Sequence, residues 1–178
     1  MTKSPDHANA GSGAARERAI GVLFVCTGNI CRSPTAEGVF RALVARAGLA
    51  EAIRVDSCGT HGYHVGEPPD ERTIRHAARR GYVLANLRAR KLASADFANF
   101  DHLIALDRIH RQILQTQAPA EARSKISLLL DHAPELGLRD VPDPYYSDAS
   151  AFDHVLDLVE SADRKSTRLN SSHGYISY

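Results

Sequence analysis

The segment Cys26–Ser33, with the sequence CTGNICRS, has the residue types and spacing of a site that handles phosphate with a cysteine nucleophile. A loop of this length can curl so that its backbone N–H groups point at one centre, and the positive end of a following helix would add to them. Gly28 and Asn29 are residue types that tolerate the left-handed backbone of such a curl. The segment therefore predicts a cradle for a phosphate dianion beside a thiol.

Three side chains of this segment predict the chemistry. The field of the cradle would favour the thiolate of Cys26, which is the form in which cysteine acts as a nucleophile. Arg32 offers a planar fork that can hold two phosphate oxygens and follow them into the transition state. Ser33 could donate its hydroxyl to the sulfur and so make it a better leaving group. Together they predict hydrolysis of a phosphate monoester through a cysteinyl-phosphate.

Two other interpretations of the cysteines carry less weight. A buried cysteine can end a strand beside an incidental arginine, but here a buried strand precedes the loop and Pro34 opens a helix after it. Structural zinc requires four ligands, and Cys58, His61 and His64 do not follow the usual pairing. We therefore expect no metal and no cofactor, and we interpret the two histidines as loop residues without a role.

A general acid for the leaving oxygen is supplied by the segment VPDPYY. Two prolines stiffen the loop around the single carboxylate of Asp143, and Tyr145 and Tyr146 would form aromatic walls. Asp-Pro is also a common turn dipeptide, so Asp143 taken alone could merely start a turn. Its pairing with the cysteine loop favours the catalytic interpretation.

The elements that must position these residues alternate along the chain. The predicted strands are Ile20–Val25, Ile53–Asp56, Leu103–Leu106 and Ile126–Leu130. The predicted helices are 34–47, 71–80, 108–117 and one whose buried face is Phe152, Val155, Leu156 and Val159. The loops 58–69 and 141–148 separate them. This order predicts a parallel sheet with helices on both faces.

Bulk properties exclude several classes of protein. A formal net charge of +1 creates no broad field for nucleic acid or for an anionic membrane. No apolar run approaches the roughly 18 residues of a membrane span, and the N-terminal residues contain no signal-peptide core. Three cysteines do not make a disulfide scaffold. We therefore expect a cytoplasmic protein that binds no nucleic acid.

Both ends of the chain are predicted to lie outside the folded domain, which we place at residues 20–162. Residues 1–19 are rich in small and polar side chains and are expected to be a disordered lead-in. Residues 163–178 begin DRKSTRLNSSH, which reads as a translated sequencing adapter. The natural C-terminus is therefore expected to be missing, and residues 164–178 to be disordered and dispensable.

The segment from about Ile20 to Ala162 resembles the low-molecular-weight protein tyrosine phosphatases. Four motifs carry the resemblance, in the order of that family: VCTGNICRSPTAE, DSCGTHGYHVGEPPDER, ALD ending at Asp107, and DPYY starting at Asp143. The resemblance implies a flavodoxin-like, three-layer α/β fold with a four-stranded parallel sheet. It also implies an active site at the carboxyl end of the first strand.

The same resemblance implies a role for each site residue. Cys26 would be the nucleophile, Arg32 the phosphate clamp and Asp143 the acid, with a phosphotyrosine-containing protein as substrate. Ser57 would hold the phosphate loop together with Asn29. The implied phosphate- and substrate-binding residues are Thr27, Gly28, Asn29, Ile30, Cys31, Ser33, Tyr63, Tyr145 and Tyr146. Cys31 also matches a second cysteine that can trap an oxidised nucleophile as a disulfide.

The chain departs from the family pattern at three positions. Cys58 stands where alanine is frequent, and Ser147 stands where glycine is frequent. Arg80 stands where some members place a histidine that braces the asparagine of the phosphate loop. These differences concern the rigidity of the loops and the behaviour of the thiols.

Three alternative functions stay open at this point. A thioredoxin-coupled arsenate reductase of this fold would use a relay of three cysteines, two of them in the segment after the second helix. Here that segment, residues 82–100, contains no cysteine. A protein-arginine phosphatase of this fold carries threonine where this chain has Ile30, and a branched apolar residue suits an aromatic ring better. A catalytically silent phosphate-binding module would not need Cys26, Arg32 and Asp143 together. The oligomeric state is not indicated.

Overall fold

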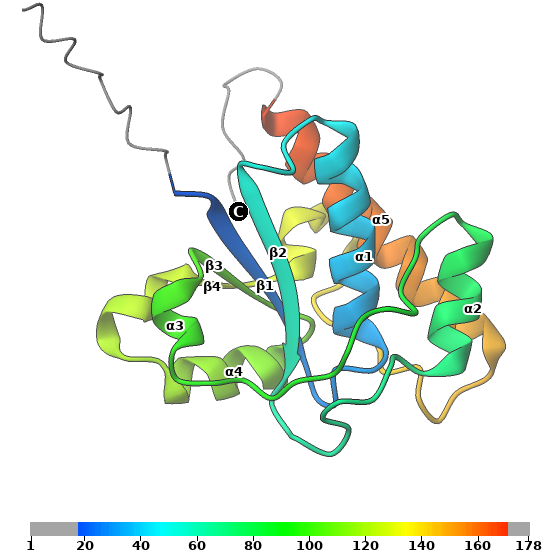
Figure 1. Ribbon diagram of the computed structural model, residues 1–178, viewed down its shortest axis with the longest axis horizontal. Coiled ribbons are helices and arrows are strands. Elements are labelled where there is room, and N and C mark those ends of the chain that lie inside the picture. Colours follow the sequence, from blue (N-terminus) through cyan, green and yellow to red (C-terminus); the bar gives the residue numbers. More distant parts are fainter. Residues whose placement is uncertain (1–17, 171–178) are drawn as a thin grey trace, which may run out of the picture.

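The core of the molecule is a four-stranded, all-parallel sheet in the order β2-β1-β3-β4 (Figure 1). The computed structural model describes residues 18–170. The strands are β1 (Ile20–Cys26), β2 (Ile53–Gly59), β3 (His102–Ala105) and β4 (Ile126–Leu128). β1 is central, and every residue after Ile20 is buried in it, as expected for a strand covered on both faces. The predicted sheet is confirmed.

Helices cover both faces of the sheet and give three layers (Figure 1). They are α1 (Arg32–Arg46), α2 (Glu71–Arg79), α3 (Asp96–Asn99), α4 (Arg108–Gln117) and α5 (Ala149–Asn170). α1 and α5 pack on one face with α2 against α5, while α3 and α4 lie on the other face. This arrangement confirms the predicted flavodoxin-like α/β fold.

Alternation along β1 divides the core into two parts. Val22 and Phe24 face α1 and α5, and Leu23 and Val25 face α3 and α4, because successive strand residues point to opposite faces. The Phe24 ring meets Phe40 of α1 edge-on, with ring centroids 5.8 Å apart. On α5 the predicted face of Phe152, Val155, Leu156 and Val159 is buried. These contacts fix the loop between β1 and α1.

Helix ends follow the capping signals of the sequence. Asp70 caps α2 by accepting the N–H of Arg72 at 2.8 Å, and Gly81 ends that segment with a φ of +85°. Asp107 caps α4 by accepting the N–H of His110 at 2.8 Å. α4 begins and ends where the sequence predicts.

Strand ends were less predictable. β2 runs three residues beyond the predicted end at Asp56, because it pairs with β1 residue by residue as far as Cys26 opposite Gly59. The buried hydroxyl of Ser57 breaks the apolar pattern that would have signalled this. β4 is shorter than predicted, since a 3₁₀ turn replaces it from Leu129 onward. The four-residue helix α3 was not predicted.

Helix α5 corrects one prediction about the C-terminus. It runs to Asn170, so the prediction of disorder is wrong for residues 164–170. Residues 171–178 and almost all of the predicted N-terminal lead-in lie outside the described residues. The domain limits and the adapter interpretation stay predictions.

Deleting residues 164–178 is therefore expected to lower the melting temperature. After the deletion α5 would end at residue 163, so its last turn, which frays, would contain Val159 and Ala162, both fully buried. A cost of about 1–2 kcal/mol would shift the melting temperature of a protein of this size by roughly 2–8 °C. Differential scanning calorimetry of the truncated and full chains measures it. Equal melting temperatures would instead support a dispensable tail.

Among residues 18–170, no helix is both long enough and apolar enough to cross a membrane.

Candidate active site

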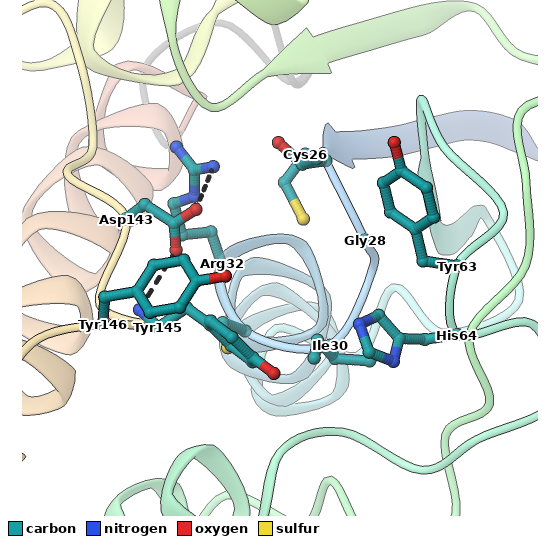
Figure 2. A pocket seen from close by; sticks show the side chains of 11 residues that line it. Cys26, Gly28, Ile30, Arg32, Tyr63, His64, Asp143, Tyr145 and Tyr146 are labelled. Carbon is teal, nitrogen blue, oxygen red and sulfur yellow. Dashed lines mark hydrogen bonds and ion pairs between the residues drawn. The ribbon is translucent and has the colours of Figure 1, made fainter.

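A pocket opens at the carboxyl end of β1, where the chain enters α1 (Figure 2). β1 lies between β2 and β3, so this is the switch point of the sheet, where doubly wound folds bind ligands. The residues that line it are Cys26, Thr27, Gly28, Ile30, Cys31, Arg32, Tyr63, His64, Asp143, Tyr145 and Tyr146. Asn29, Ser33 and Ser57 are buried behind it. The structure thus brings the site residues predicted from distant segments together.

The loop between β1 and α1 turns its carbonyl groups outward. The carbonyls of Cys26, Thr27 and Ile30 accept backbone N–H groups of the segment 60–70, at 2.8, 3.0 and 2.9 Å. In a trans peptide the N–H points opposite to the carbonyl. The amides that follow these three carbonyls are therefore directed toward the inside of the loop, where an anion would lie.

The N-terminus of α1 adds to this cradle. Its first residues, Arg32 and Ser33, are buried, no side chain caps the helix, and its first turn holds no acidic residue. The first N–H groups of a helix have no partner within the helix and carry a partial positive charge. The described arrangement therefore leaves the start of α1 suited to an anion.

Asn29, rather than Gly28, adopts the left-handed backbone of the loop. Its φ is +58°, whereas Gly28 has no positive φ, which corrects the prediction for that glycine. Gly28 instead allows a close approach, because a Cβ there would lie 3.1 Å from the ring of His64. Asn29 tolerates the strained backbone because its side chain is held on several sides.

The side chain of Asn29 is the centre of a buried hydrogen-bond network. Its amide donates to Ser33 Oγ at 2.9 Å and to Ser57 Oγ at 2.8 Å, and its carbonyl accepts the N–H of Arg90 at 2.9 Å. Ser57 in turn donates to Glu37 at 2.5 Å. The contact between Asn29 and Ser57 that the family resemblance implies is therefore present.

Glu37 was missed by the sequence analysis, although a glutamate on the buried face of α1 is an unusual residue that could have marked it. Burial raises the pKa of its carboxyl, against the opposing effect of the Ser57 hydroxyl and the Arg41 guanidinium. Arg80, in contrast, follows the last residue of α2 and pairs with Asp157 and Glu160 of α5. It takes no part in bracing the loop.

Cys26 and Ser33 meet at the floor of the pocket. Cys26 Sγ lies 2.9 Å from Ser33 Oγ. The Ser33 oxygen already accepts the amide of Asn29, so its own proton is free to point away from that donor. Sγ is nearer to it than the alternative acceptor, the carbonyl of Cys58 at 3.4 Å. The geometry therefore allows Ser33 to donate to the sulfur.

Arg32 is buried and held by carboxylates on two sides. Its Nη1 donates to Asp107 at 2.7 Å and to the carbonyl of Val141 at 3.1 Å. Its Nη2 donates to Asp143 at 3.2 Å, the contact that Figure 2 shows. Nη2 carries a second hydrogen, so the edge formed by Nε and Nη2 can still hold an anion in the pocket, beside or in place of Asp143. A guanidinium edge of this kind matches two phosphate oxygens.

Asp143 reaches the pocket from the loop between β4 and α5, and half of its side chain is exposed. Its Oδ1 accepts the N–H of Tyr145 at 3.2 Å, so the carboxylate is fixed to its own loop. Arg72 of α2 donates to the carbonyl of Tyr145 at 3.0 Å and packs its guanidinium on Phe152. These contacts tie the loop that carries Asp143 to α2 and α5.

Aromatic rings stand on opposite sides of the pocket (Figure 2). Tyr63 lies on one side, stacked on His61 with ring centroids 5.1 Å apart. Tyr145 and Tyr146 lie on the other side and meet edge-on at 4.8 Å. Tyr63 and Tyr146 are largely exposed, so their faces are available to a flat substrate. His64 also lines the pocket, although no signal in the sequence placed it there.

The two remaining cysteines differ in their access to the pocket. Cys31 lines it, and burial raises the pKa of its thiol to about 12. Cys58 is fully buried in the core between β1 and α3, where burial also raises the pKa of its thiol.

Asp107 and His110 were missed as site residues. Asp107 ends the ALD motif, which was noted without a role, and its carboxylate contacts Arg32. His110 Nδ1 lies 2.8 Å from Asp107 Oδ1, and Nε2 lies 2.8 Å from the hydroxyl of Thr27. The partners His110 and Arg32 hold the pKa of the Asp107 carboxyl far below its usual range, against the effect of burial. The described residues contain no group of three or more metal-ligating side chains.

Comparison with known proteins agrees with this geometry. The family model "Low molecular weight phosphotyrosine protein phosphatase" matches residues 21–170. The low molecular weight protein-tyrosine-phosphatase YfkJ of Bacillus subtilis is 42% identical over 142 residues, which cover 80% of this chain and 90% of the relative. The human low molecular weight phosphotyrosine protein phosphatase is 41% identical over 136 residues, covering 75% and 85%. The crystal structure of YfkJ matches with a TM-score of 0.82 at 38% identity, covering 90% of this chain and 99% of the other.

Proposed function

Because this chain belongs to the low molecular weight phosphotyrosine protein phosphatase family, we propose that it hydrolyses phosphotyrosine in proteins, and small aryl phosphates, with Cys26 as nucleophile. The chain is a protein-tyrosine phosphatase by family. The observation that supports the residue roles is the convergence of Cys26, Arg32 and Asp143 on one pocket beneath inward-directed amides.

In the first step Cys26 Sγ attacks phosphorus and the bond to the phenolic oxygen breaks. Arg32 and the amides of the loop hold the three remaining oxygens, whose charge the transition state redistributes. Protonated Asp143 gives its proton to the leaving oxygen, because a phenol leaves more readily than a phenolate. The products are a free phenol and a cysteinyl-phosphate.

In the second step a water molecule attacks the phosphorus of the cysteinyl-phosphate. Asp143, now a carboxylate, takes a proton from the water. The S–P bond breaks and inorganic phosphate forms. The hydroxyl of Ser33, 2.9 Å from Sγ, stabilises the departing thiolate.

The walls of the pocket favour an aromatic substrate. Tyr63 faces Tyr145 and Tyr146 across the opening, and the apolar side chain of Ile30 lies in the lining (Figure 2). Offset stacking between such walls suits the ring of phosphotyrosine. Phosphoarginine would bring a charged guanidinium against Ile30, so a protein-arginine phosphatase is the less favoured alternative. An arsenate reductase would need a cysteine relay that the segment 82–100 does not provide.

The test is the mass spectrum of the enzyme trapped during turnover. Acid quench with p-nitrophenyl phosphate should add one phosphoryl group to the peptide that contains Cys26. Phosphotyrosine peptides should give the same adduct, whereas phosphoarginine peptides and arsenate should not be turned over. A chelator should leave the rate unchanged. An adduct on another residue, or faster turnover of phosphoarginine, would overturn the proposal.

Mild peroxide is expected to inactivate the enzyme reversibly through a disulfide between Cys26 and Cys31, both of which line the pocket. Peroxide converts the Cys26 thiolate into a sulfenic acid, and the Cys31 sulfur then displaces water from it. Since the thiolate attacks and the pKa of Cys31 is raised to about 12, disulfide formation should accelerate by up to about tenfold per pH unit below that value.

Peptide mapping after oxidation at several pH values measures this prediction. Cys31→Ser should lose activity irreversibly at lower peroxide doses, while Cys58→Ala should behave as the parent enzyme. A disulfide between Cys26 and Cys58, or equal irreversible loss in the Cys31 variant and the parent, would contradict the role of Cys31.

We further propose a cytoplasmic location, because a mechanism that needs a reduced Cys26 beside a second thiol suits a reducing compartment. Fractionation with an antibody to the chain tests the location, and recovery from an oxidising compartment would overturn it.

A further inference from the structure

His110 connects two parts of the site that the proposed chemistry needs separately. Thr27 follows the nucleophile in the loop, and Arg32 is the clamp at the start of α1. His110 belongs to α4, on the opposite face of the sheet from α1. Its ring is buried and lies between the Thr27 hydroxyl and the carboxylate of Asp107, at 2.8 Å from each.

The order of the contacts leads from the loop to the clamp. Thr27 Oγ1 meets His110 Nε2, His110 Nδ1 meets Asp107 Oδ1, and Asp107 Oδ2 accepts Arg32 Nη1 at 2.7 Å. Nδ1 and Oδ1 lie 2.8 Å apart but do not have the alignment of a hydrogen bond, so the ring contacts the carboxylate through a short polar contact that a proton on Nδ1 would make favourable. The other ring nitrogen, Nε2, forms the hydrogen bond with the hydroxyl of Thr27.

The backbone of His110 strengthens the same connection. Its N–H donates to Asp107 Oδ1 at 2.8 Å as the cap of α4. One oxygen of Asp107 thus accepts the backbone N–H of His110 and lies 2.8 Å from its ring nitrogen, and the other oxygen is left to orient Arg32. The ring is 3% exposed and the carboxylate 14% exposed, so water competes little for these contacts.

Thr27 is the point at which this connection bears on the phosphate. Its carbonyl is held outward by the N–H of His61 at 3.0 Å, and its side chain is held by His110. A rotation of Thr27 would move both the adjacent sulfur of Cys26 and an amide of the cradle. Asn29, Ser57 and Glu37 brace the loop from α1 and β2, whereas nothing in that network reaches Thr27.

We infer that His110 is a positioning residue: it fixes Thr27 of the phosphate loop to Asp107, so that the nucleophile's end of the loop and the Arg32 clamp keep one relative geometry. It touches neither the substrate nor the reacting atoms. The inference rests on the proposed function, since it assigns His110 to the cradle in which phosphate is transferred.

Removing the ring should therefore weaken binding of the transition state in a protein that stays folded. His110→Ala is expected to lower kcat/KM for p-nitrophenyl phosphate by about 10- to 100-fold, the usual cost of a displaced catalytic group. Orthovanadate, which mimics the pentacoordinate phosphorus, should lose affinity by a similar factor. Inorganic phosphate, a ground-state ligand, should lose less.

Thr27→Val gives the second arm, because it keeps the shape of Thr27 and removes the hydroxyl. If the two residues act through one contact, the double variant should be no worse than His110→Ala alone. Thr27→Ser restores a hydroxyl and should recover most of the loss of Thr27→Val. Full additivity of the two single variants would overturn the inference.

Two variants on α4 separate positioning from stability. Leu114→Ala opens the buried face of α4 without touching the chain of contacts, so it should lower the melting temperature and leave kcat/KM unchanged below that temperature. Thr116→Val makes the same chemical change as Thr27→Val at an exposed position and should change neither. If His110→Ala behaves as Leu114→Ala does, His110 is only a packing residue and the inference fails.

Calorimetry with orthovanadate keeps the inference separate from the proposed function. If the parent enzyme does not hydrolyse p-nitrophenyl phosphate, the proposed function fails on that result. Orthovanadate affinity that falls in His110→Ala and Thr27→Val, without additivity, still supports the positioning role. Unchanged affinity in both folded variants overturns it.

Discussion

Replacing Cys26 with serine is expected to abolish hydrolysis of aryl phosphates, with a loss of at least about 10⁴-fold in kcat. A neutral hydroxyl is a poor nucleophile unless a base takes its proton. Within the described residues, Cys26 Sγ makes its hydrogen bond with the hydroxyl of Ser33, which is not a base. Nothing in the immediate contacts of residue 26 would activate a serine.

The same variant should still bind inorganic phosphate, because the amides of the loop and Arg32 are unchanged. Turnover of p-nitrophenyl phosphate and calorimetry with phosphate measure the two properties on one preparation. Cys58→Ala is the matched control, since it removes a buried thiol on β2 that is not part of the pocket. Residual turnover above about 1% of the parent rate in Cys26→Ser would contradict a cysteinyl-phosphate mechanism.

Local sequence signals were sufficient for the framework of the fold. The apolar run Ile20–Val25 is long enough to need cover on both faces, and it became the central strand. Helix α4 runs from Arg108 to Gln117 as predicted, because the pattern that defines a helix and the cap that begins it are local in the sequence. The end of β2 could not be read in this way, since its last three residues are strand only through pairing with β1.

The candidate site divides along the same line. Cys26, Arg32 and Asp143 could be predicted because their residue types indicate a chemistry and their motifs are local; the structure brings them to one pocket, and their catalytic roles stay predictions. Glu37, Asp107 and His110 were missed because each acts through a neighbour that is distant in the sequence: Glu37 through Ser57, and His110 through Thr27, 83 positions away. The available signal was a charged or polar residue on the apolar face of a helix, and this signal does not indicate which distant residue it contacts.

The position of Arg32 between two carboxylates explains why these missed residues matter. Asp107 is only 14% exposed and pairs with Nη1, whereas Asp143 is half exposed and pairs with Nη2. The inner carboxylate keeps its charge, since the pKa of Asp107 is lowered, and it fixes the guanidinium before any phosphate arrives. The outer carboxylate is half exposed and so can change partners, as the acid–base role proposed for it requires.

Asp143→Asn is expected to lower kcat/KM by roughly 10²- to 10⁴-fold for phenyl phosphate, whose phenolate leaves poorly without a proton. The amide keeps the size of the side chain, and its oxygen can still accept the N–H of Tyr145, so the loop should hold its shape. It cannot deliver the proton to the leaving oxygen. With p-nitrophenyl phosphate, whose anion is stable, the loss should be much smaller.

The dependence on the leaving group separates the acid role from a structural one. Plotting log kcat/KM, which reports the step in which the phenol leaves, against the acidity of a series of substituted phenols should give a steeper slope for Asp143→Asn than for the parent, because the variant leaves more negative charge on the departing oxygen. Asp148→Asn removes one carboxylate from the same loop, where it only caps Ser150, and should leave the slope unchanged. An equal loss across all leaving groups in Asp143→Asn would mean that Asp143 serves to hold Arg32 and the loop, and the proton would have to come from another group.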